Sequence, residues 1–245
     1  YSKPAGQFII RNKSFRKDRA LFSKENIHVV ESEFLEGEVA LKEGKNLLIE
    51  KCKFKSNYPL WYNKGTVVKD SEFLKECRSS VWYGKEMDFE KCIIKGPKFL
   101  RESRNIIIKN TNVIGSDECS WWCEDLTINK SLFQGDYFGL GSKNLNIKNS
   151  EIKGKYPLQH IKGISYLKNV KIIGKDAFWD SKNIVIQKCV IKGPYAGWNS
   201  ENLTFIDSTI IGSQPLCYSK NIILINTELE QAKGAFEFST VYSID

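Results

Sequence analysis

The segment Ile184-Val-Ile-Gln-Lys-Cys-Val-Ile191 carries apolar residues at its first, third and eighth positions and a small residue at its sixth. The same arrangement returns 19 residues later in Leu203-Thr-Phe-Ile-Asp-Ser-Thr-Ile210, and after another 19 in Ile222-Ile-Leu-Ile-Asn-Thr-Glu-Leu229. Apolar residues at alternate positions indicate short strands that bury one face. A unit that recurs at a fixed period indicates a solenoid, in which each repeat packs on its neighbours.

The repeat extends over most of the chain. Eleven units, spaced by 19 to 21 residues, begin at Ile27, Leu47, Thr66, Met87, Ile106, Leu126, Leu145, Ser165, Ile184, Leu203 and Ile222. Each unit closes on a short turn, often at an Asn, which tolerates left-handed backbone. The pattern predicts an all-β fold, a single-stranded right-handed parallel β-helix of about 11 to 12 coils. Pentapeptide and left-handed hexapeptide helices are disfavoured because their coils keep lengths in multiples of five or six.

We expect one domain over residues 1–245. Residues 27–245 form the regular coils, and residues 1–26 form an irregular coil or cap, since Phe8, Ile10 and Phe15 occupy the first, third and eighth positions. The stretch 236–245 is strand-like and contains no obvious cap, although a solenoid end has an open strand edge to cover. Another segment or another chain would have to cover it.

Composition narrows the function classes. The 245 residues contain no apolar run of about 18 and no charged stretch followed by an apolar one, so neither a membrane span nor a secretory signal is predicted. Seven scattered cysteines favour a reducing compartment, and we expect a cytoplasmic protein. The net charge of +8 suits an anionic partner such as an acidic glycan, whereas no nucleic-acid-binding motif accompanies it. No metal site or cofactor is predicted, because the spacing of Cys119 and Cys123 fits no zinc motif.

Two columns before the turns gather aromatic residues. Counted back from the turn, the fourth and third residues include polar side chains, so both columns are expected to face outward, and five of the six tryptophans fall in the fourth. Trp and Tyr stack on sugar faces or anchor partners. The predicted substrate-binding residues are Trp61, Tyr62, Trp82, Tyr83, Arg101, Glu102, Trp121, Trp122, Gln159, Trp179, Trp198, Asn199 and Tyr218. Alternatively, the aromatic stripe is covered, or only stabilises the solenoid.

Acid–base groups occur in the same columns. His160 and Asp180 fall on adjacent coils, where a carboxylate could orient an imidazole, and Gly141 would leave a gap beside them. They are the predicted catalytic residues. A glycosidase-type carboxylate pair could instead come from nearby acids, namely Glu102, Asp117, Glu118, Asp136 and Asp176.

The residue just before the turn is a cation in eight of ten coils, at Lys45, Lys64, Lys85, Arg104, Lys143, Lys162, Lys182 and Lys220. Such a basic edge would suit a uronate polymer. It is more typical of a solvated turn edge that prevents sideways strand pairing.

Several turn-adjacent segments carry a resemblance: Ala40-Leu-Lys-Glu43, Tyr58-Pro-Leu-Trp-Tyr62, Cys77-Arg-Ser-Ser-Val-Trp-Tyr83, Ala177-Phe-Trp-Asp180, Gly197-Trp-Asn199 and Gln214-Pro-Leu-Cys-Tyr218. Over nearly the whole chain, the sequence resembles an uncharacterised bacterial family of single-domain proteins in the pectin/pectate-lyase-like β-helix superfamily. The resemblance implies the fold but no reaction, since that superfamily includes lyases, polygalacturonases, esterases and adhesins. The polygalacturonase signatures and a calcium-dependent lyase cluster are absent.

Three functions remain open. The leading one is a carbohydrate-recognising β-helix that uses the aromatic ladder. The second is a polysaccharide-cleaving enzyme, a glycoside hydrolase or lyase, that uses His160 and Asp180 or an unassigned carboxylate pair. The third is a structural solenoid whose aromatic stripe lies in a subunit contact of a homo-oligomer.

Overall fold

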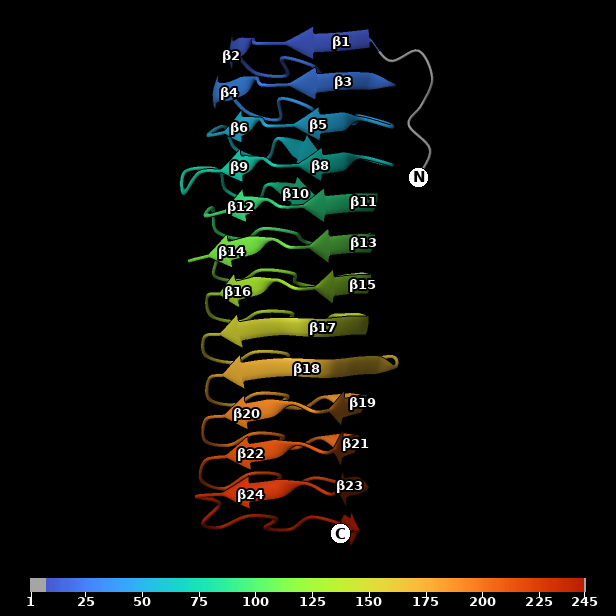
Figure 1. Ribbon diagram of the computed structural model, residues 1–245, viewed down its shortest axis with the longest axis vertical. Coiled ribbons are helices and arrows are strands. Elements are labelled where there is room, and N and C mark those ends of the chain that lie inside the picture. The colour runs from blue at the N-terminus through green and yellow to red at the C-terminus, as the bar shows by residue number, and fades with distance from the viewer. Residues whose placement is uncertain (1–7, 245) are drawn as a thin grey trace.

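The computed structural model describes residues 8–244, which wind into a right-handed parallel β-helix (Figure 1). The predicted fold class is confirmed. Each coil has a first strand, a bend, a second strand and a third side built mainly of turns. Strands of successive coils lie side by side, and every strand pair is parallel. Within residues 8–244, no helix is long and apolar enough to cross a membrane.

The first strands form one sheet. They are β1 (Phe8–Arg11), β3 (Ile27–Val30), β5 (Leu48–Glu50), β8 (Val67–Lys69), β11 (Lys85–Glu90), β13 (Arg104–Lys109), β15 (Glu124–Asn129), the first parts of β17 (Lys143–Lys153) and β18 (Ser165–Ile173), then β19 (Lys182–Gln187), β21 (Glu201–Ile206), β23 (Ile222–Ile225) and β25 (Val241–Ile244).

The second strands form the adjoining sheet. They are β2 (Ser14–Arg16), β4 (Glu33–Glu36), β6 (Lys53–Phe54), β9 (Glu72–Phe73), β12 (Ile93–Ile94), β14 (Asn112–Ile114), β16 (Leu132–Gln134), the later parts of β17 and β18, then β20 (Val190–Lys192), β22 (Thr209–Ile211) and β24 (Glu228–Glu230). The third side carries the short strands β7 (Leu60–Trp61) and β10 (Val81–Trp82), which pair with each other.

The register reproduces the sequence columns. Ile186 pairs with Phe205, and Phe205 with Leu224, so residues at the same repeat position lie directly above one another. All three are buried. Because a parallel ladder places equal positions in line, an apolar column in the sequence becomes a continuous apolar strip in the interior.

Aromatic rings stack inside the N-terminal coils. Phe15, Phe34, Phe54 and Phe73 occupy one column, with ring centroids 4.9, 4.9 and 4.5 Å apart along it. The last three rings are fully buried. The stack lies along the solenoid axis and joins neighbouring coils through dispersion and apolar burial.

The bend between the first and second strands combines a left-handed residue with a small buried one. At the bend of β17, Asn149 has φ of 49°, and the next residue, Ser150, donates its hydroxyl to the Lys148 carbonyl (2.6 Å). Ser131 N donates in turn to Ser150 Oγ (3.1 Å), so the small side chain also ties two coils together. This explains why the sixth repeat position is restricted to small residues.

Both ends of the described chain follow the ladder. β1 pairs in register with β3, and β2 pairs with β4 with a register shift between Phe15 and Arg16, so the first described coil is slightly irregular. β25 pairs with β23, in agreement with the strand-like sequence there. Residues 1–7 and 245, which belong to the expected cap and last coil, lie outside the described residues.

All seven cysteines are free and buried. Burial raises the pKa of the Cys52 thiol to about 11 and that of Cys77 to about 12. A thiol that stays protonated is a poor nucleophile and metal ligand, so these side chains are packing groups. The cytoplasmic location that their number suggested remains a prediction.

Candidate functional site

The third side of the coils presents a surface that we call the aromatic face, made of Trp61, Tyr62, Trp82, Tyr83, Trp121, Trp122, Trp179, Trp198 and Tyr218. Among its most exposed rings are those of Tyr62, Tyr83, Trp122 and Tyr218, which expose 49, 37, 51 and 48% of their surface. Their backbones are fixed, because each donates its N–H to the next coil, as Tyr62 does to the Trp82 carbonyl (2.9 Å).

The N-terminal part of this face is a double stack. Trp61 lies on Trp82 with centroids 5.8 Å apart, and Tyr62 lies on Tyr83 at 4.9 Å with planes 14° apart. Glu102 accepts a hydrogen bond from Trp82 Nε1 (3.1 Å). Desolvation and the nearby Glu102 carboxylate raise the pKa of Tyr83, which keeps its hydroxyl protonated. Glu102 thus holds the Trp82 and Tyr83 end of the stack in place.

Two other indole rings are held by hydrogen bonds from their N–H groups to backbone carbonyls. Trp121 Nε1 donates to the Tyr137 carbonyl (2.7 Å), and Trp198 Nε1 donates to the Gln214 carbonyl (2.6 Å). These partly buried rings support the more exposed rings of the same face. Trp179 is more open, at 37% exposed.

Arg101 and Gln159 do not take the place expected of them. Both were predicted to contact a ligand, yet each is only 8% exposed. The Arg101 guanidinium stacks on the Trp121 ring, 4.5 Å from its centroid, and forms an ion pair with Glu118. The Arg101 side chain therefore packs against its neighbours and holds the Trp121 ring of the aromatic face in place.

His160, Asp180 and Asn199 form a hydrogen-bond chain across three coils. His160 Nδ1 lies 2.6 Å from Asp180 Oδ2, and Asn199 Nδ2 donates to Asp180 Oδ1 (3.0 Å). The structure therefore brings the predicted pair together and adds Asn199 as a third member. Because the two nitrogens lie at different edges of the ring, a proton on Nδ1 facing Asp180 leaves Nε2 directed away from the carboxylate as an acceptor.

The gap expected at Gly141 is filled. A Cβ built on this residue would lie 2.6 Å from Trp122 Cδ1, so the Trp122 indole covers the glycine. Gly141 also has a positive φ of 68°. Glycine here allows Trp122 to lie along the next coil rather than opening a hole beside His160.

The other nearby acids have structural partners. Asp117 and Asp136 accept hydrogen bonds from the backbone N–H groups of Asp136 and Lys155 (2.8 and 2.7 Å). Glu118 pairs with Arg101 and with Lys98 (2.8 Å). For Asp176, burial raises the pKa, which Lys175 partly opposes. Carboxylates used in these contacts join coils, which leaves the histidine chain as the acid–base arrangement with the clearest geometry.

The basic edge is partly neutralised. Lys45 pairs with Glu25 (2.7 Å), Lys143 with Glu124 (2.9 Å) and Lys182 with Glu201 (2.9 Å). Ion pairs between neighbouring coils are what a solvated turn edge would contain, so this edge is a weaker anion site than its cation count suggested. Within residues 8–244, no three His, Cys, Asp or Glu side chains converge as a metal site.

A further aromatic column was missed in the sequence. Tyr137 and Tyr156 stack with centroids 4.7 Å apart, and Lys175 lies over the Tyr156 ring at 4.8 Å. Tyr58, Tyr137, Tyr156 and Tyr195 all lie seven residues before the turn. Counting further back from the turn would have revealed this column beside the aromatic face.

Solved structures are similar to this chain at low sequence identity. A surface adhesin of Streptococcus pneumoniae, PfbA, matches with a TM-score of 0.49 and 10% identity over 97% of this chain and 81% of its own. The tailspike protein gp49 of the Acinetobacter baumannii bacteriophage Fri1, a capsular polysaccharide depolymerase, matches with a TM-score of 0.49 and 9% identity over 88% of this chain and 57% of its own.

The A-module of the Azotobacter vinelandii mannuronan C-5 epimerase AlgE4 matches with a TM-score of 0.34 and 8% identity over 98% of this chain and 91% of its own. No curated protein matches the chain. One family model covers residues 8–244, almost the full length. The chain therefore belongs to the family described as protein of unknown function (DUF3737).

Proposed function

We propose that the protein binds carbohydrate along its aromatic face. The observation that carries this proposal is the row of half-exposed rings, Tyr62, Tyr83, Trp122 and Tyr218, on one side of a rigid ladder. Rings that served only to hold the solenoid together would be expected to be covered. These rings expose apolar surface and polar tips at fixed positions, which is the combination that sugar rings bind.

Polar groups complete the surface. In the same column as Trp122, His160, Asp180 and Asn199 present hydrogen-bonding atoms that are already oriented by one another. A glycan that lies along the solenoid would therefore meet apolar rings and then polar groups. Because these side chains are preorganised, little conformational entropy is lost on binding.

The test is affinity for a panel of neutral glycans, namely β-glucan, xylan, galactan and cellohexaose, measured by calorimetry and tryptophan fluorescence. Replacement of Trp122 by Ala is expected to weaken binding about ten-fold or more, since a tryptophan that a ligand covers contributes strongly to the contact. Tyr166, on the outer face of the first sheet, gives a matched control, and Tyr166→Ala should leave affinity unchanged. Binding by none of these glycans, or equal binding by Trp122→Ala, would reject the proposal.

A second candidate function, glycan cleavage, is favoured by the His160–Asp180–Asn199 chain alone. In this proposal, His160 Nε2 exchanges a proton with the bound glycan, and Asp180 positions the imidazole. His160→Gln should abolish product formation while binding persists. Asp180→Asn should lower turnover and shift its pH profile, because the carboxylate no longer holds the Nδ1–H tautomer. If the unmodified protein cleaves none of the glycans that it binds, the cleavage proposal is rejected and only carbohydrate binding is left.

A further inference from the structure

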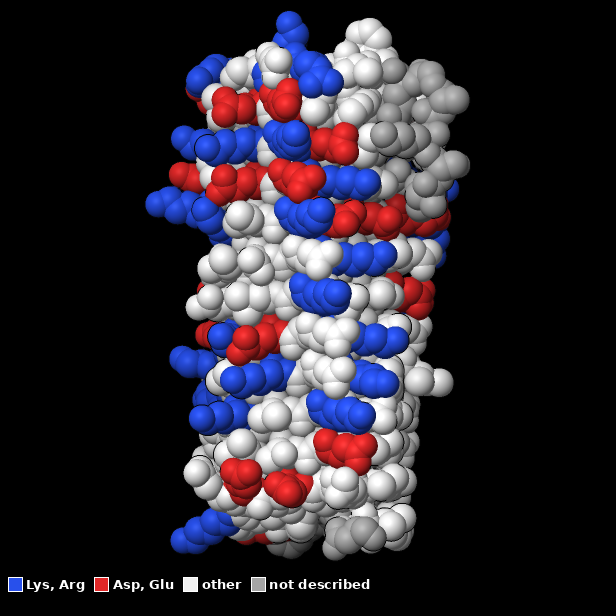
Figure 2. Space-filling view, viewed as in Figure 1, with Lys and Arg blue, Asp and Glu red and all other residues white. Residues whose placement is uncertain are grey.

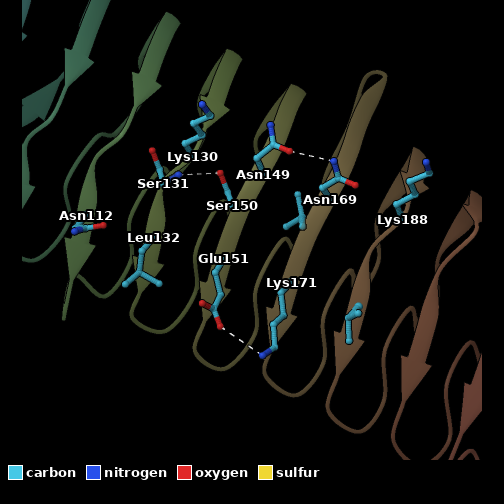
Figure 3. Close-up of a pocket in the computed structure, with 12 residues that line it drawn as sticks. Asn112, Lys130, Ser131, Leu132, Asn149, Ser150, Glu151, Asn169, Lys171 and Lys188 are labelled. Atoms are coloured by element: carbon cyan, nitrogen blue, oxygen red, sulfur yellow. Dashed lines mark hydrogen bonds and ion pairs between the residues drawn. The ribbon is translucent and has the colours of Figure 1, made fainter.

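On another side of the solenoid, a groove of about 660 Å³ runs along the bend between the first and second strands (Figure 3). We call the part lined by residues of β14, β16, β17, β18 and β20 the corner groove. Its lining residues are Asn112, Lys130, Ser131, Leu132, Asn149, Ser150, Glu151, Asn169, Val170, Lys171, Lys188 and Val190. It lies apart from the aromatic face, since these residues come from the bends and second strands rather than the third side.

The groove is hollow because its floor is made of small side chains. Ser131, Ser150 and Val170 are buried at the bend, while Lys130, Asn149, Asn169 and Lys188 form one row along the outer edge (Figure 3). These four residues all have φ between 49 and 53°, so their side chains leave the bend in the same backbone geometry. The row is therefore a regular ladder with one side chain per coil.

The middle of the row offers fixed hydrogen-bonding groups. Asn169 Nδ2 donates to Asn149 Oδ1 (3.1 Å), and Asn149 Nδ2 donates to Asn129 Oδ1 (2.9 Å). An amide has two N–H donors, so each of Asn149 and Asn169 keeps one for a ligand. The amides are thus oriented before any ligand arrives.

The two ends of the row are cationic. Among residues 8–244, neither Lys130 nor Lys188 has a carboxylate within ion-pair distance. The one acid in the groove, Glu151, is compensated by Lys153 (3.1 Å) and Lys171 (3.9 Å). Because Lys171 pairs with Glu151, Lys130 and Lys188 are the lining cations left over, and they give the corner groove a positive potential that attracts anions.

A second hollow, at the same bend nearer the N-terminus, has a different charge. There its lining includes Glu31, Glu33, Asp70 and Glu72 against Lys51 and Lys53. Acidic and basic side chains alternate over those coils, near the top of the view, whereas blue side chains stand out over the middle coils (Figure 2). The bend geometry is shared, so the positive charge is a local property of the corner groove.

We propose that the corner groove binds an extended acidic polysaccharide, with its anionic groups at Lys130 and Lys188 and its hydroxyl groups at the Asn149 and Asn169 amides. This site is separate from the proposed aromatic-face site and does not depend on it.

Spacing favours a glycan over other polyanions. Coils follow one another at about 4.8 Å, and one pyranose of an extended glycan advances by nearly this length. Side chains on one face of an extended peptide repeat at about 6.6 Å, which does not match the coil spacing. The groove lining also contains no aromatic ring on which a base could stack. Lys130 and Lys188 lie three coils apart, about 14 Å, which corresponds to the ends of a tetrasaccharide.

The test uses the Trp122→Ala variant, so that the aromatic face contributes little. It measures affinity for hexasaccharides of β-1,4-glucuronate, β-1,4-mannuronate and α-1,4-galacturonate, with cellohexaose as the uncharged counterpart. We expect at least one acidic oligomer to bind more tightly than cellohexaose, and more weakly as salt is raised. The double variant Lys130→Asn/Lys188→Asn should weaken that binding about ten-fold. Asparagine already occupies this row and tolerates its backbone, so the variant should fold.

Lys51→Asn/Lys91→Asn is the matched control, because it removes two charges from the same backbone position in the N-terminal coils. It should retain affinity. The proposal is overturned if no acidic hexasaccharide binds better than cellohexaose, or if both double variants lose affinity equally. The proposal is also overturned, in favour of nucleic acid, if the double variant Lys130→Asn/Lys188→Asn loses affinity for a thymidine dodecamer but not for any hexasaccharide. Trp122→Ala should leave acidic binding intact, which separates this result from that of the aromatic face.

Discussion

Neighbouring N-terminal coils stack aromatic rings both inside and outside the solenoid. Phe34 and Phe54 in the interior have centroids 4.9 Å apart, and Tyr62 and Tyr83 on the aromatic face have the same separation. The register alone produces both stacks, because equal positions of parallel coils lie in line. The difference is solvent: the phenylalanines are fully buried, whereas the tyrosines are partly exposed. Stacking therefore reports the fold, and exposure identifies the surface that is free to bind.

The largest difference between the two stacks should be in stability. Phe54→Ala removes a fully buried ring between two others and should lower the free energy of unfolding by about 3–5 kcal/mol. Urea unfolding followed by circular dichroism measures this. A loss under about 1 kcal/mol would mean that the interior stack is dispensable, and the contrast with the exterior would fail.

The interior constraint should extend to the backbone. A Cβ on Gly174 would lie 1.7 Å from the Gly154 carbonyl oxygen. Gly174→Ala is therefore expected to cost about 1–3 kcal/mol or more through overpacking between coils. At Gly115, by contrast, nothing lies within 4 Å of such a Cβ and φ is +70°. Gly115→Ala should cost only about 1–2 kcal/mol from its backbone conformation. Equal losses would show that the close approach at Gly174 relaxes freely.

The buried thiols should make the stability of the fold depend on pH in the alkaline range. Burial raises the pKa of Cys77 to about 12, above its ordinary value of 9.0, so above pH 9 the folded chain holds protons that the unfolded chain releases. Stability is thus fully present below pH 9 and falls as pH rises toward 12, by about 1.4 kcal/mol per pH unit for each such thiol. Urea unfolding at several alkaline pH values should show this decline, and Cys77→Ala should make it shallower. An unchanged slope in that variant would contradict the assignment.

The smallest stability effect should come from the exterior stack. Tyr62→Ala/Tyr83→Ala removes one stacked pair at the surface, and we expect a loss of about 0.5–1.5 kcal/mol. The same variant should weaken glycan binding, measured as for Trp122→Ala, while Tyr62→Phe/Tyr83→Phe separates the rings from their hydroxyl groups. A stability loss as large as that of Phe54→Ala, with glycan affinity unchanged, would make the exterior stack a structural element like the interior one.

The columns could be predicted from the sequence because the register repeats them without interruption. Ile186, Phe205 and Leu224 were expected in one buried column, and they pair directly. The pairing of His160 with Asp180 followed from the same counting. The side-chain positions of Arg101 and Trp122 could not be predicted in this way. A column tells on which coil and which face a residue lies, but it does not give the rotamer of the side chain. Arg101 folds onto Trp121 and Glu118, and Trp122 lies over Gly141.

The corner groove illustrates the same limit. The sequence indicated small residues at the bend, but a hollow depends on how the neighbouring side chains leave a left-handed backbone. Within the part of the chain that the structure describes, Lys130 and Lys188 have no ion-pair partner, whereas Lys51 lies 4.0 Å from Glu31. This difference depends on contacts between coils. Such contacts require side-chain positions that repeat counting does not supply.

The uniform register also bears on how the chain folds. Paired residues are separated by about one coil, as in Phe8 with Ile27 or Ile186 with Phe205, which are 19 residues apart in each case. Relative to 245 residues, this separation is about 0.08, a contact order typical of fast-folding helical bundles rather than β proteins. Few pairings require closure of a loop longer than one coil, so a folded coil can template the next. Folding should then proceed by growth along the axis, and unfolding by peeling from an end.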